Sequence, residues 1–294
     1  LHRGRRGPGA LARLGSVEVS AAVHGRGYPA ATMNLSALHD RAVIERALRR
    51  DPWLHLYELG DLDDFFWPRT TWWGLETDGA IARVALLYTG SELPVLVAHG
   101  RPADGAEVER LLERLAAVLP RRFYAHLAVG AARALGRGWR GEHRGVHERM
   151  ALVAPAALEG VDASRAEPLG PDDAAELERF FASAYPGHWF DRRMLATGCY
   201  YGVREGASLA SVAGVHVVSR AQRVAALGNV ATAPAHRGKG LARIACVAVC
   251  RCLRETVDHI GLNVDSTNRA AIAMYEDLGF ERVAQYEELA FEPA

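Results

Sequence analysis

The stretch Gly228-Asn-Val-Ala-Thr-Ala-Pro-Ala-His-Arg-Gly-Lys-Gly-Leu-Ala242 decides how this chain is interpreted. A strand pattern that ends at Pro234 is followed by a loop with two glycines, and the loop opens directly into an apolar helix. Glycines let the backbone approach a ligand closely, and the N–H groups of the first helical turn point outward at the positive end of the helix dipole. The stretch therefore predicts a cradle for a phosphate or pyrophosphate, with added charge from Arg237 and Lys239. A plain strand-to-helix turn with a solvated basic edge is the alternative.

Two other nucleotide-binding motifs do not fit the sequence. A P-loop requires GxxxxGK[ST], whereas Lys239 is followed by Gly240 and no glycine stands five residues before Gly238. The pattern GxGxxG does occur at Gly136, Gly138 and Gly141, but it follows a predicted short helix and opens no helix. We interpret it as a chance match.

Length predicts about two domains, because 294 residues exceed the usual size of one compact domain. We expect a mobile tail over residues 1–33, a first lobe over 34–155 and a second over 156–294. The tail is rich in Gly, Arg and Ala and shows no periodicity. Met33 opens the first patterned segment, so an upstream-extended reading frame competes with a basic arm for nucleic acid as the explanation of the tail.

The two lobes show the same order of predicted elements. The first has a helix at 36–49, an acidic Trp-rich stretch at 53–67, hairpin strands at 72–76 and 80–88 around Thr77-Asp78-Gly79, a strand at 94–98, a helix at 106–119, a strand at 123–127, a short helix at 130–135 and a strand at 147–153. After a linker at 154–166, the second has helices at 171–184 and 190–197, a hairpin of 200–205 with 207–219, a strand at 224–232, a helix at 241–257, a strand at 260–264, a helix at 268–278 and a final strand pair ending at Phe291. This order predicts an α+β fold of three layers.

Composition and charge exclude several classes of protein. The hydrophobic fraction of 49% and the charged fraction of 24% are typical of globular proteins, and the apolar runs are too short to cross a bilayer. A formal charge of +0 provides no global field that would attract nucleic acid or anionic lipid.

The cysteines and histidines do not predict a metal site. The four cysteines form no CxxC pair and follow no secretory leader, so we expect a reducing cytoplasm. Cys246 and Cys250 are one helical turn apart in an apolar stripe, where buried thiols are the expected interpretation. His143 and His147 could share a helix face, but glycines interrupt it and no further ligand lies nearby. We therefore expect no metal.

Two motifs resemble those of one enzyme family. Arg237-Gly-Lys-Gly-Leu-Ala242 matches the R/Q-x-x-G-x-G/A signature of the GCN5-related N-acetyltransferases (GNAT), and the stretch from Asn268 to Phe280 matches their N-x-x-A-x-x-x-Y-x-x-x-G-F motif. The resemblance covers roughly residues 165–294. In the first lobe it rests on element order, because Val97-Ala-His-Gly-Arg-Pro-Ala lacks the loop signature. The chain therefore resembles a tandem GNAT protein, each lobe a mixed, mostly antiparallel sheet flanked by helices, with a degenerate first lobe.

The resemblance implies a site for acetyl-CoA as acyl donor. The backbone of Gly238, Lys239, Gly240, Leu241 and Ala242 would hold the pyrophosphate, beside Arg237. Val230, Ala231 and Thr232 would pair with the pantetheine arm as an extra strand would, and one of their N–H groups would polarise the thioester carbonyl. Asn268 would contact the same arm, and Tyr275 would protonate the leaving thiolate. A core aromatic is the alternative interpretation of Tyr275.

The group that takes the proton of the amine is less evident. Relatives often carry a glutamate near the end of the fourth strand, whereas this chain has Leu227-Gly228-Asn229. Asn229 could orient a water, and His216 or Glu287 could accept the proton through it. For the acceptor, Tyr185-Pro-Gly-His-Trp-Phe190 offers aromatic walls. The stretch from Glu58 to Trp67 offers carboxylates and aromatics that suit a cation, or else forms an interface between the lobes.

These observations predict an N-acetyltransferase in which a primary amine attacks acetyl-CoA directly. We expect a small molecule or amino acid as acceptor rather than a protein, and no partner membrane or nucleic acid. A homodimer is left open. The main alternative is a non-catalytic acyl-CoA sensor or scaffold, which would explain the missing glutamate. A second alternative is a regulator that binds nucleic acid through its basic tail.

Overall fold

The computed structural model describes residues 33–187 and 190–294. The predicted tail, apart from Met33, and the pair His188-Trp189 of the predicted acceptor wall lie outside these ranges. Residues Thr32–Ala294 form one compact unit.

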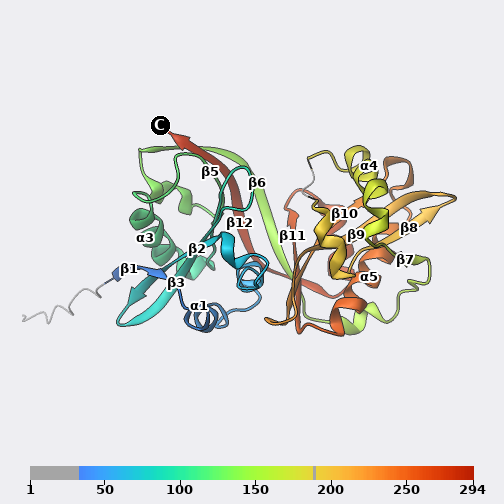
Figure 1. The fold of residues 1–294 in the computed structure, drawn as a ribbon, viewed down its shortest axis with the longest axis horizontal. Helices are drawn as coiled ribbons and strands as arrows, with labels where there is room; N and C mark the ends of the chain where they lie inside the picture. Colours follow the sequence, from blue (N-terminus) through green and yellow to red (C-terminus); the bar gives the residue numbers. More distant parts are fainter. Residues whose placement is uncertain (1–32, 188–189) are drawn as a thin grey trace, which may run out of the picture. The chain divides into compact units, whose positions relative to one another are not determined.

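One sheet of twelve strands runs through this unit, in the order β1-β2-β3-β4-β5-β12-β6-β11-β10-β9-β8-β7 (Figure 1). The strands are β1 (Met33–Leu38), β2 (Thr70–Thr77), β3 (Ala80–Tyr88), β4 (Val95–Ala98), β5 (Phe123–Ala128), β6 (Trp139–Leu152), β7 (Ala166–Pro168), β8 (Tyr201–Glu205), β9 (Ser208–Ser219), β10 (Val224–Thr232), β11 (His259–Asp265) and β12 (Phe280–Pro293). Only β4 with β5 and β10 with β11 pair in parallel among the described strands. The predicted mixed, mostly antiparallel sheet is confirmed.

Helices lie in the same places in both halves of the sequence. They are α1 (Arg41–Leu48), α2 (Leu56–Gly60), α3 (Gly105–Leu115), α4 (Ala174–Ala184), α5 (Leu241–Arg254) and α6 (Arg269–Asp277), with short 3-10 turns such as η3 (Ala131–Leu135) and η6 (Arg192–Thr197) between them. The order from β1 to β6 therefore repeats from β7 to β12, with η6 in the place of α2 and α6 in that of η3. The predicted α+β alternation is confirmed.

The two halves exchange their last strands. β12 pairs along most of its length with β6, and its part from Tyr286 to Phe291 also pairs with β5 of the first half. β6 in turn pairs with β11 of the second half. Figure 1 shows β6 and β12 side by side in the middle of the sheet. A division of the chain near residue 155 stays a prediction, and the sheet is continuous on both sides of it.

The predicted helix at 36–49 is wrong in its first part. Residues Met33–Leu38 form β1, which pairs antiparallel with β2. The helix starts only after Asp40, whose carboxylate accepts hydrogen bonds from the N–H groups of Ala42 and Val43. Sheet pairing to a distant strand therefore overrides the local helical pattern, and the N-cap sets the boundary.

The predicted final strand pair is also wrong. β12 is a single strand, and its register against β6 shifts between Arg282 and Ala284. This irregularity resembles a break between two strands when only the hydrophobic pattern is available. β6 begins at Trp139, eight residues before the predicted start at His147, and the edge strand β7 begins at Ala166, the last residue of the predicted linker.

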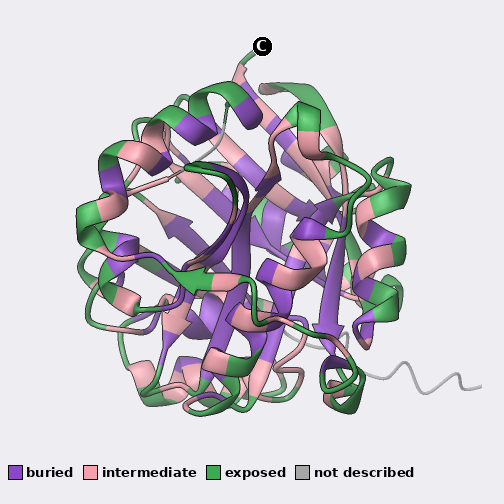
Figure 2. Cartoon of the chain, turned by 90° about the vertical axis from the view of Figure 1, so that its right-hand side faces the viewer, coloured by how far each residue is buried: buried purple, intermediate pink, exposed green. Residues whose placement is uncertain are grey.

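Three hydrophobic clusters cover the faces of the sheet. One packs α4, α5 and α6 against the second half, and another packs α3 against the first. The third joins Leu56, Leu59 and Leu62 at α2 to Val217 and Ala226 of the second half. Figure 2 shows buried strands in the middle and exposed residues on the outer faces of the helices. No helix within the described ranges is long and apolar enough to cross a membrane.

Candidate active site

A cavity of about 950 Å³ opens where β10 and β11 separate. The two strands pair only from Val224 to Leu227 on β10, after which β10 continues alone to Thr232. Its register against β9 shifts between Gly228 and Ala231, so two residues of β10 oppose one of β9, as in a β-bulge. The cavity is lined from within 227–232 of β10, 236–243 of the loop and α5, 262–265 of β11 and 268–277 of α6.

The bulge residue Asn229 is buried and has a left-handed backbone with φ of 52°. Its Nδ2 donates to the hydroxyl of Tyr200 at 3.0 Å. The His216 ring of β9 lies against Gly228, where a Cβ would come within 2.2 Å of the ring. Asn229 therefore lines the cavity with its amide held by a fixed partner, and its action on a water stays a prediction.

The free edge of β10 offers backbone groups to the cavity. The N–H of Ala233 donates to β9, and the direction of successive amides alternates along a strand. The N–H of Thr232 therefore points away from β9, while that of Ala231 points toward it. Val230 belongs to the bulge, outside the regular ladder. All three predicted residues line the cavity.

The loop after β10 forms the predicted strand-to-helix junction. Gly238 and Gly240 have φ of 75° and 74°, and a Cβ on either would meet no atom within 4 Å. Gly240 is the N-cap of α5, and no side chain caps this helix end. The first-turn N–H groups, at Leu241 and Ala242, are therefore available to an anion in the cavity.

Three basic side chains near this helix end differ in their contacts and in whether they line the cavity. Arg237 donates to the carbonyl oxygens of Thr232 and Ala184, at 3.2 and 3.4 Å, and so braces the loop. Lys239 is not among the residues that line the cavity, and its Nζ lies 3.5 Å from Nδ1 of His236. Arg243, in the first turn of α5, does line the cavity. Sequence analysis missed it because the family signature ends at Ala242.

α6 supplies the two residues of the second motif. Asn268 is its N-cap, and its Oδ1 accepts from the N–H of Ala271 at 3.2 Å, which leaves its Nδ2 for a ligand. Tyr275 is 5% exposed, packs edge-on against Phe280 and lines the cavity. Burial raises the pKa of Tyr275 well above its ordinary value, so its hydroxyl keeps its proton at neutral pH.

Sequence comparison identifies the part of the chain that builds this cavity. The sequence profile of the Acetyltransferase (GNAT) family matches residues 166–280. Residues 166–280 form a GNAT domain. An uncharacterized protein of Mycobacterium leprae (strain TN) is 32% identical over 126 residues, which make up 40% of this chain and 33% of that protein. The chain thus matches about a third of the length of this curated relative.

Solved structures resemble the whole described unit. A Drosophila protein of 13% identity aligns with a TM-score of 0.61 over 87% of this chain and 97% of its own. A tandem GNAT protein from the clavulanic acid biosynthesis pathway, 15% identical, aligns with a TM-score of 0.51 over 89% of this chain and 98% of its own. At these identities the likeness shows the fold. Other structures, which align with this chain at 22% and 16% identity, are named GNAT acetyltransferases, and they too show a likeness of fold.

The two proton acceptors predicted outside the motifs lie in different places. His216 lines the cavity of the GNAT domain, and burial lowers its pKa to about 4, although a hydrogen bond with Asn229 opposes this effect. Glu287 is not among the lining residues, and its carboxylate accepts from the N–H of Gly130 in the first half of the chain. The structure therefore brings only His216 to the cavity.

The acidic aromatic stretch from Glu58 to Trp67 does not line the cavity. The interpretation of this stretch as an interface is confirmed, because Asp63 accepts from Ser219 of β9, and leucines of the stretch pack against β9 and β10. Asp64 pairs with Arg41 instead of facing a ligand.

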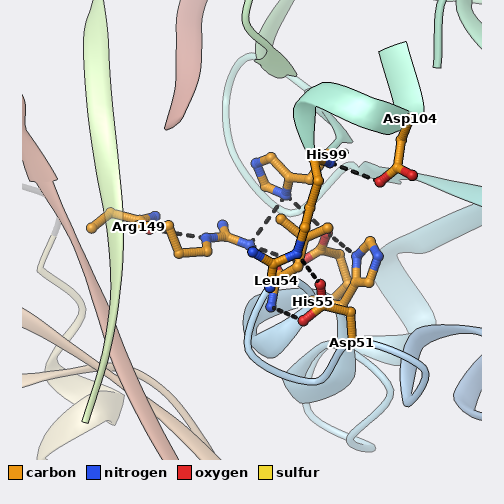
Figure 3. Close-up of polar contacts among 9 residues, drawn as sticks. Asp51, Leu54, His55, His99, Asp104 and Arg149 are labelled. Atoms are coloured by element: carbon orange, nitrogen blue, oxygen red, sulfur yellow. Dashed lines mark hydrogen bonds and ion pairs between the residues drawn. The ribbon is translucent and has the colours of Figure 1, made fainter. Parts of the chain in front are cut away.

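Glu58 is the centre of a buried polar network within the first half of the chain, and Figure 3 shows its members His55, His99 and Arg149. Its Oε1 lies 3.0 Å from Nδ1 of His55 and 2.9 Å from Nδ1 of His99, and its Oε2 lies 3.4 Å from Arg149 of β6. Arg149 also donates to the carbonyl of Leu54. Burial opposes ionisation of Glu58, but His99 and His55 outweigh it and hold the pKa of this carboxyl well below its ordinary value. The groups of this network therefore pair with one another, except for Nε2 of His99, which has no hydrogen-bond partner among the described residues.

The first half carries acidic groups where the GNAT domain has its open helix end. α3 begins beside Asp104, whose carboxylate accepts from the N–H of Arg101 and pairs with Arg83. Glu107 lies in the first turn of α3 and also pairs with Arg83. An anion would meet two carboxylates at this position.

Four polar side chains, which we call the far wall of the cavity, were not connected with one another by the sequence analysis. His147 of β6, Tyr185 after α4, and Asn263 and Asp265 of β11 all line the cavity. His147 and Asp265 are direct partners across the two strands. The sequence gives no signal that His147 and Asp265 lie side by side, because this pairing depends on the exchange of β6 between the halves. In the described part of the chain no group of His, Cys, Asp and Glu is arranged to hold a metal ion.

Proposed function

We propose that this chain is an N-acyltransferase that moves an acetyl group from acetyl-CoA to a primary amine by direct attack. The observation that carries the proposal is the separation of β10 from β11 above an uncapped, glycine-flanked helix end. A free strand edge suits the amide-bearing pantetheine arm, and the helix end suits its pyrophosphate. One cavity contains both features and Tyr275.

Each part of the cavity would contribute to the reaction. Gly238 to Ala242 would hold the pyrophosphate, with Arg243 adding charge. A backbone N–H of the 230–232 edge would stabilise the oxyanion that forms when the amine attacks the thioester carbonyl. When the C–S bond breaks, the Tyr275 hydroxyl would give its proton to the thiolate and regain one from the solvent. Because the amine attacks directly, no covalent bond to the protein is needed.

The acceptor is proposed to be a small amine or amino acid. Carboxylate and aromatic groups on the far wall, namely Asp265 and Tyr185, suit a cation. We propose that the first half does not bind acetyl-CoA, because Asp104 and Glu107 occupy the corresponding helix end. A homodimer, the absence of a nucleic-acid partner and a cytoplasmic location stay predictions.

Calorimetric titration with acetyl-CoA, followed by thiol release with lysine, spermidine, glucosamine and a peptide α-amine, tests the proposal. Binding with turnover on one class of amine is expected. Binding without turnover would favour the second candidate, an acyl-CoA sensor, which is suggested by the amide of Asn229 where a carboxylate base would be expected. Absence of binding would contradict the acetyl-CoA site.

A further inference from the structure

The far wall of the cavity contains an arrangement that resembles a proton relay. His147 lines the cavity with 20% of its side chain exposed, and its Nδ1 is buried 3.6 Å from Oε1 of Glu288 on β12. No described residue forms a hydrogen bond with this Nδ1. Because Nδ1 faces inward, Nε2 is the ring nitrogen that an acceptor in the cavity can reach.

We propose that His147 is the general base of the acyl transfer, and that Glu288 is the residue that positions it. This inference rests on the proposed function and names the group that the sequence leaves open. In the neutral ring, a proton on Nδ1 directed at Glu288 leaves the lone pair of Nε2 toward the amine. Catalytic hydrogen bonds are often long before substrate binds, so a separation of 3.6 Å is compatible with this role.

Glu288 is itself fixed by neighbours on two strands. Its Oε2 accepts from the hydroxyl of Tyr124 on β5 at 2.5 Å, and its Oε1 accepts from that of Tyr286 on β12 at 3.3 Å. The ring of Tyr286 stacks on His147, with centroids 5.4 Å apart and planes 20° apart. These contacts hold both the carboxylate and the imidazole in place, as a histidine base requires.

Charged side chains from three strands surround His147. Asp265 faces it from β11 and Glu288 from β12, while Arg149, two residues along β6, opposes them. Arg149 is already paired with Glu58 of α2. His126 of β5 lies 3.5 Å from Glu288, and burial lowers the pKa of His126 to about 4, so it is neutral near pH 7.

The rival base His216 has weaker support. Burial lowers its pKa to about 4, although a hydrogen bond with Asn229 opposes this effect. His147, in contrast, lies beside two carboxylates, those of Glu288 and Asp265.

The proton balance of the step is complete. The acceptor ammonium gives one proton to Nε2 of His147, and the ring releases it to solvent after the reaction. The neutral amine forms the N–C bond, the oxyanion then re-forms the carbonyl as the C–S bond breaks, and the second amine proton passes to solvent as the amide forms. Tyr275 supplies the proton of the thiol and recovers one. The amide keeps one proton, the CoA thiol carries one and one is released.

The test compares His147→Gln with the matched control His143→Gln, an exposed histidine four residues earlier on the same strand. Acetyl-CoA calorimetry first verifies that each variant keeps the donor site. With the amine that wild type acetylates best, kcat/KM of His147→Gln is expected to fall about 100-fold or more at pH 7, the usual contribution of a general base. The loss should shrink toward pH 10, where the free amine exists without a base. His143→Gln should match wild type.

Glu288→Gln tests the positioning role separately. It is expected to lower kcat/KM about tenfold, and the double variant with His147→Gln should be no slower than His147→Gln alone, because both act through one ring. Two results would overturn the inference while the proposed acyl transfer stands. One is that kcat/KM of His147→Gln decreases at acid pH as that of wild type does. The other is that His216→Gln loses this decrease. If wild type releases no thiol with any of the four amines, the proposed function fails, and the inference fails with it.

Discussion

Gly240→Ala separates the role of the α5 end in binding from its role in the fold. Gly240 has φ of +74°, and a Cβ added there would meet no atom within 4 Å. A clash within the protein is therefore excluded, and the cost to the fold is the left-handed backbone of an alanine, about 1 to 2 kcal/mol. For a chain of this size, such a cost lowers the melting temperature by about 2 to 4 °C per kcal/mol.

The effect on acetyl-CoA should be larger than this backbone cost suggests. The new Cβ stands in the open space of the cavity, where an anion would contact the first-turn N–H groups. Loss of one hydrogen bond to a charged group costs about 1.5 to 3 kcal/mol. We therefore expect the Kd for acetyl-CoA in calorimetry to rise at least about tenfold, equivalent to about 1.4 kcal/mol.

Gly206→Ala is the matched control. Gly206 lies in the exposed hairpin turn between β8 and β9, has φ of +61°, and a Cβ added there would also meet no atom within 4 Å. Both variants should lose similar stability, and only Gly240→Ala should lose affinity. Wild-type affinity in Gly240→Ala would refute the cradle. Equal loss in both variants would assign the effect to stability.

Three further outcomes are expected. Tyr275→Phe keeps the packing on Phe280, so turnover should fall about 100-fold while the calorimetric Kd for acetyl-CoA stays within about twofold; an unchanged rate would remove the hydroxyl from the mechanism. Arg149→Met leaves the buried carboxylate of Glu58 without its arginine and should lower the free energy of unfolding in urea by about 3 to 5 kcal/mol. Arg41→Met breaks an exposed ion pair and should lower it by at most about 1 kcal/mol. Similar losses in both variants would contradict a stabilising role of the buried pair. Burial lowers the pKa of His99 to about 3 and that of His126 to about 4, below the ordinary 6.5. As the pH falls, the unfolded chain therefore binds protons before the folded one does, and the melting temperature should fall from pH 7 to pH 5. If His126→Gln shows the full wild-type pH dependence of the melting temperature, the lowered pKa of His126 is contradicted.

Local chemistry explains which elements the sequence predicts well. The hairpin at Asp78 and Gly79 follows from residues that accept positive φ, which both adopt here. The start of α5 follows from the glycine loop and the apolar period after it. Each of these signals lies within about ten residues of the structure that it specifies, so no distant contact is needed to interpret it.

Elements that depend on distant pairing are predicted poorly. β1 resembles part of a helix until β2 pairs with it, and β12 resembles two strands because its register shifts near Val283. The bulge at Asn229 also has no local signature, since it is defined by the count of residues on β9 opposite it. Sequence patterns carry the period of a strand but not the identity of its partner.

The candidate base shows how far this limit extends into function. His126, His147 and Glu288 lie on β5, β6 and β12, more than twenty residues apart in every pair, and each residue alone is typical of a solvated strand position. They become neighbours because β12 lies between β5 and β6 in the sheet. In an unexchanged sheet, the carboxylate of Glu288 would lie beside other residues. The exchange of last strands therefore joins the far wall of the cavity to the GNAT domain. The motifs that bind the acyl donor are local in sequence, so they can be recognised without knowledge of this exchange.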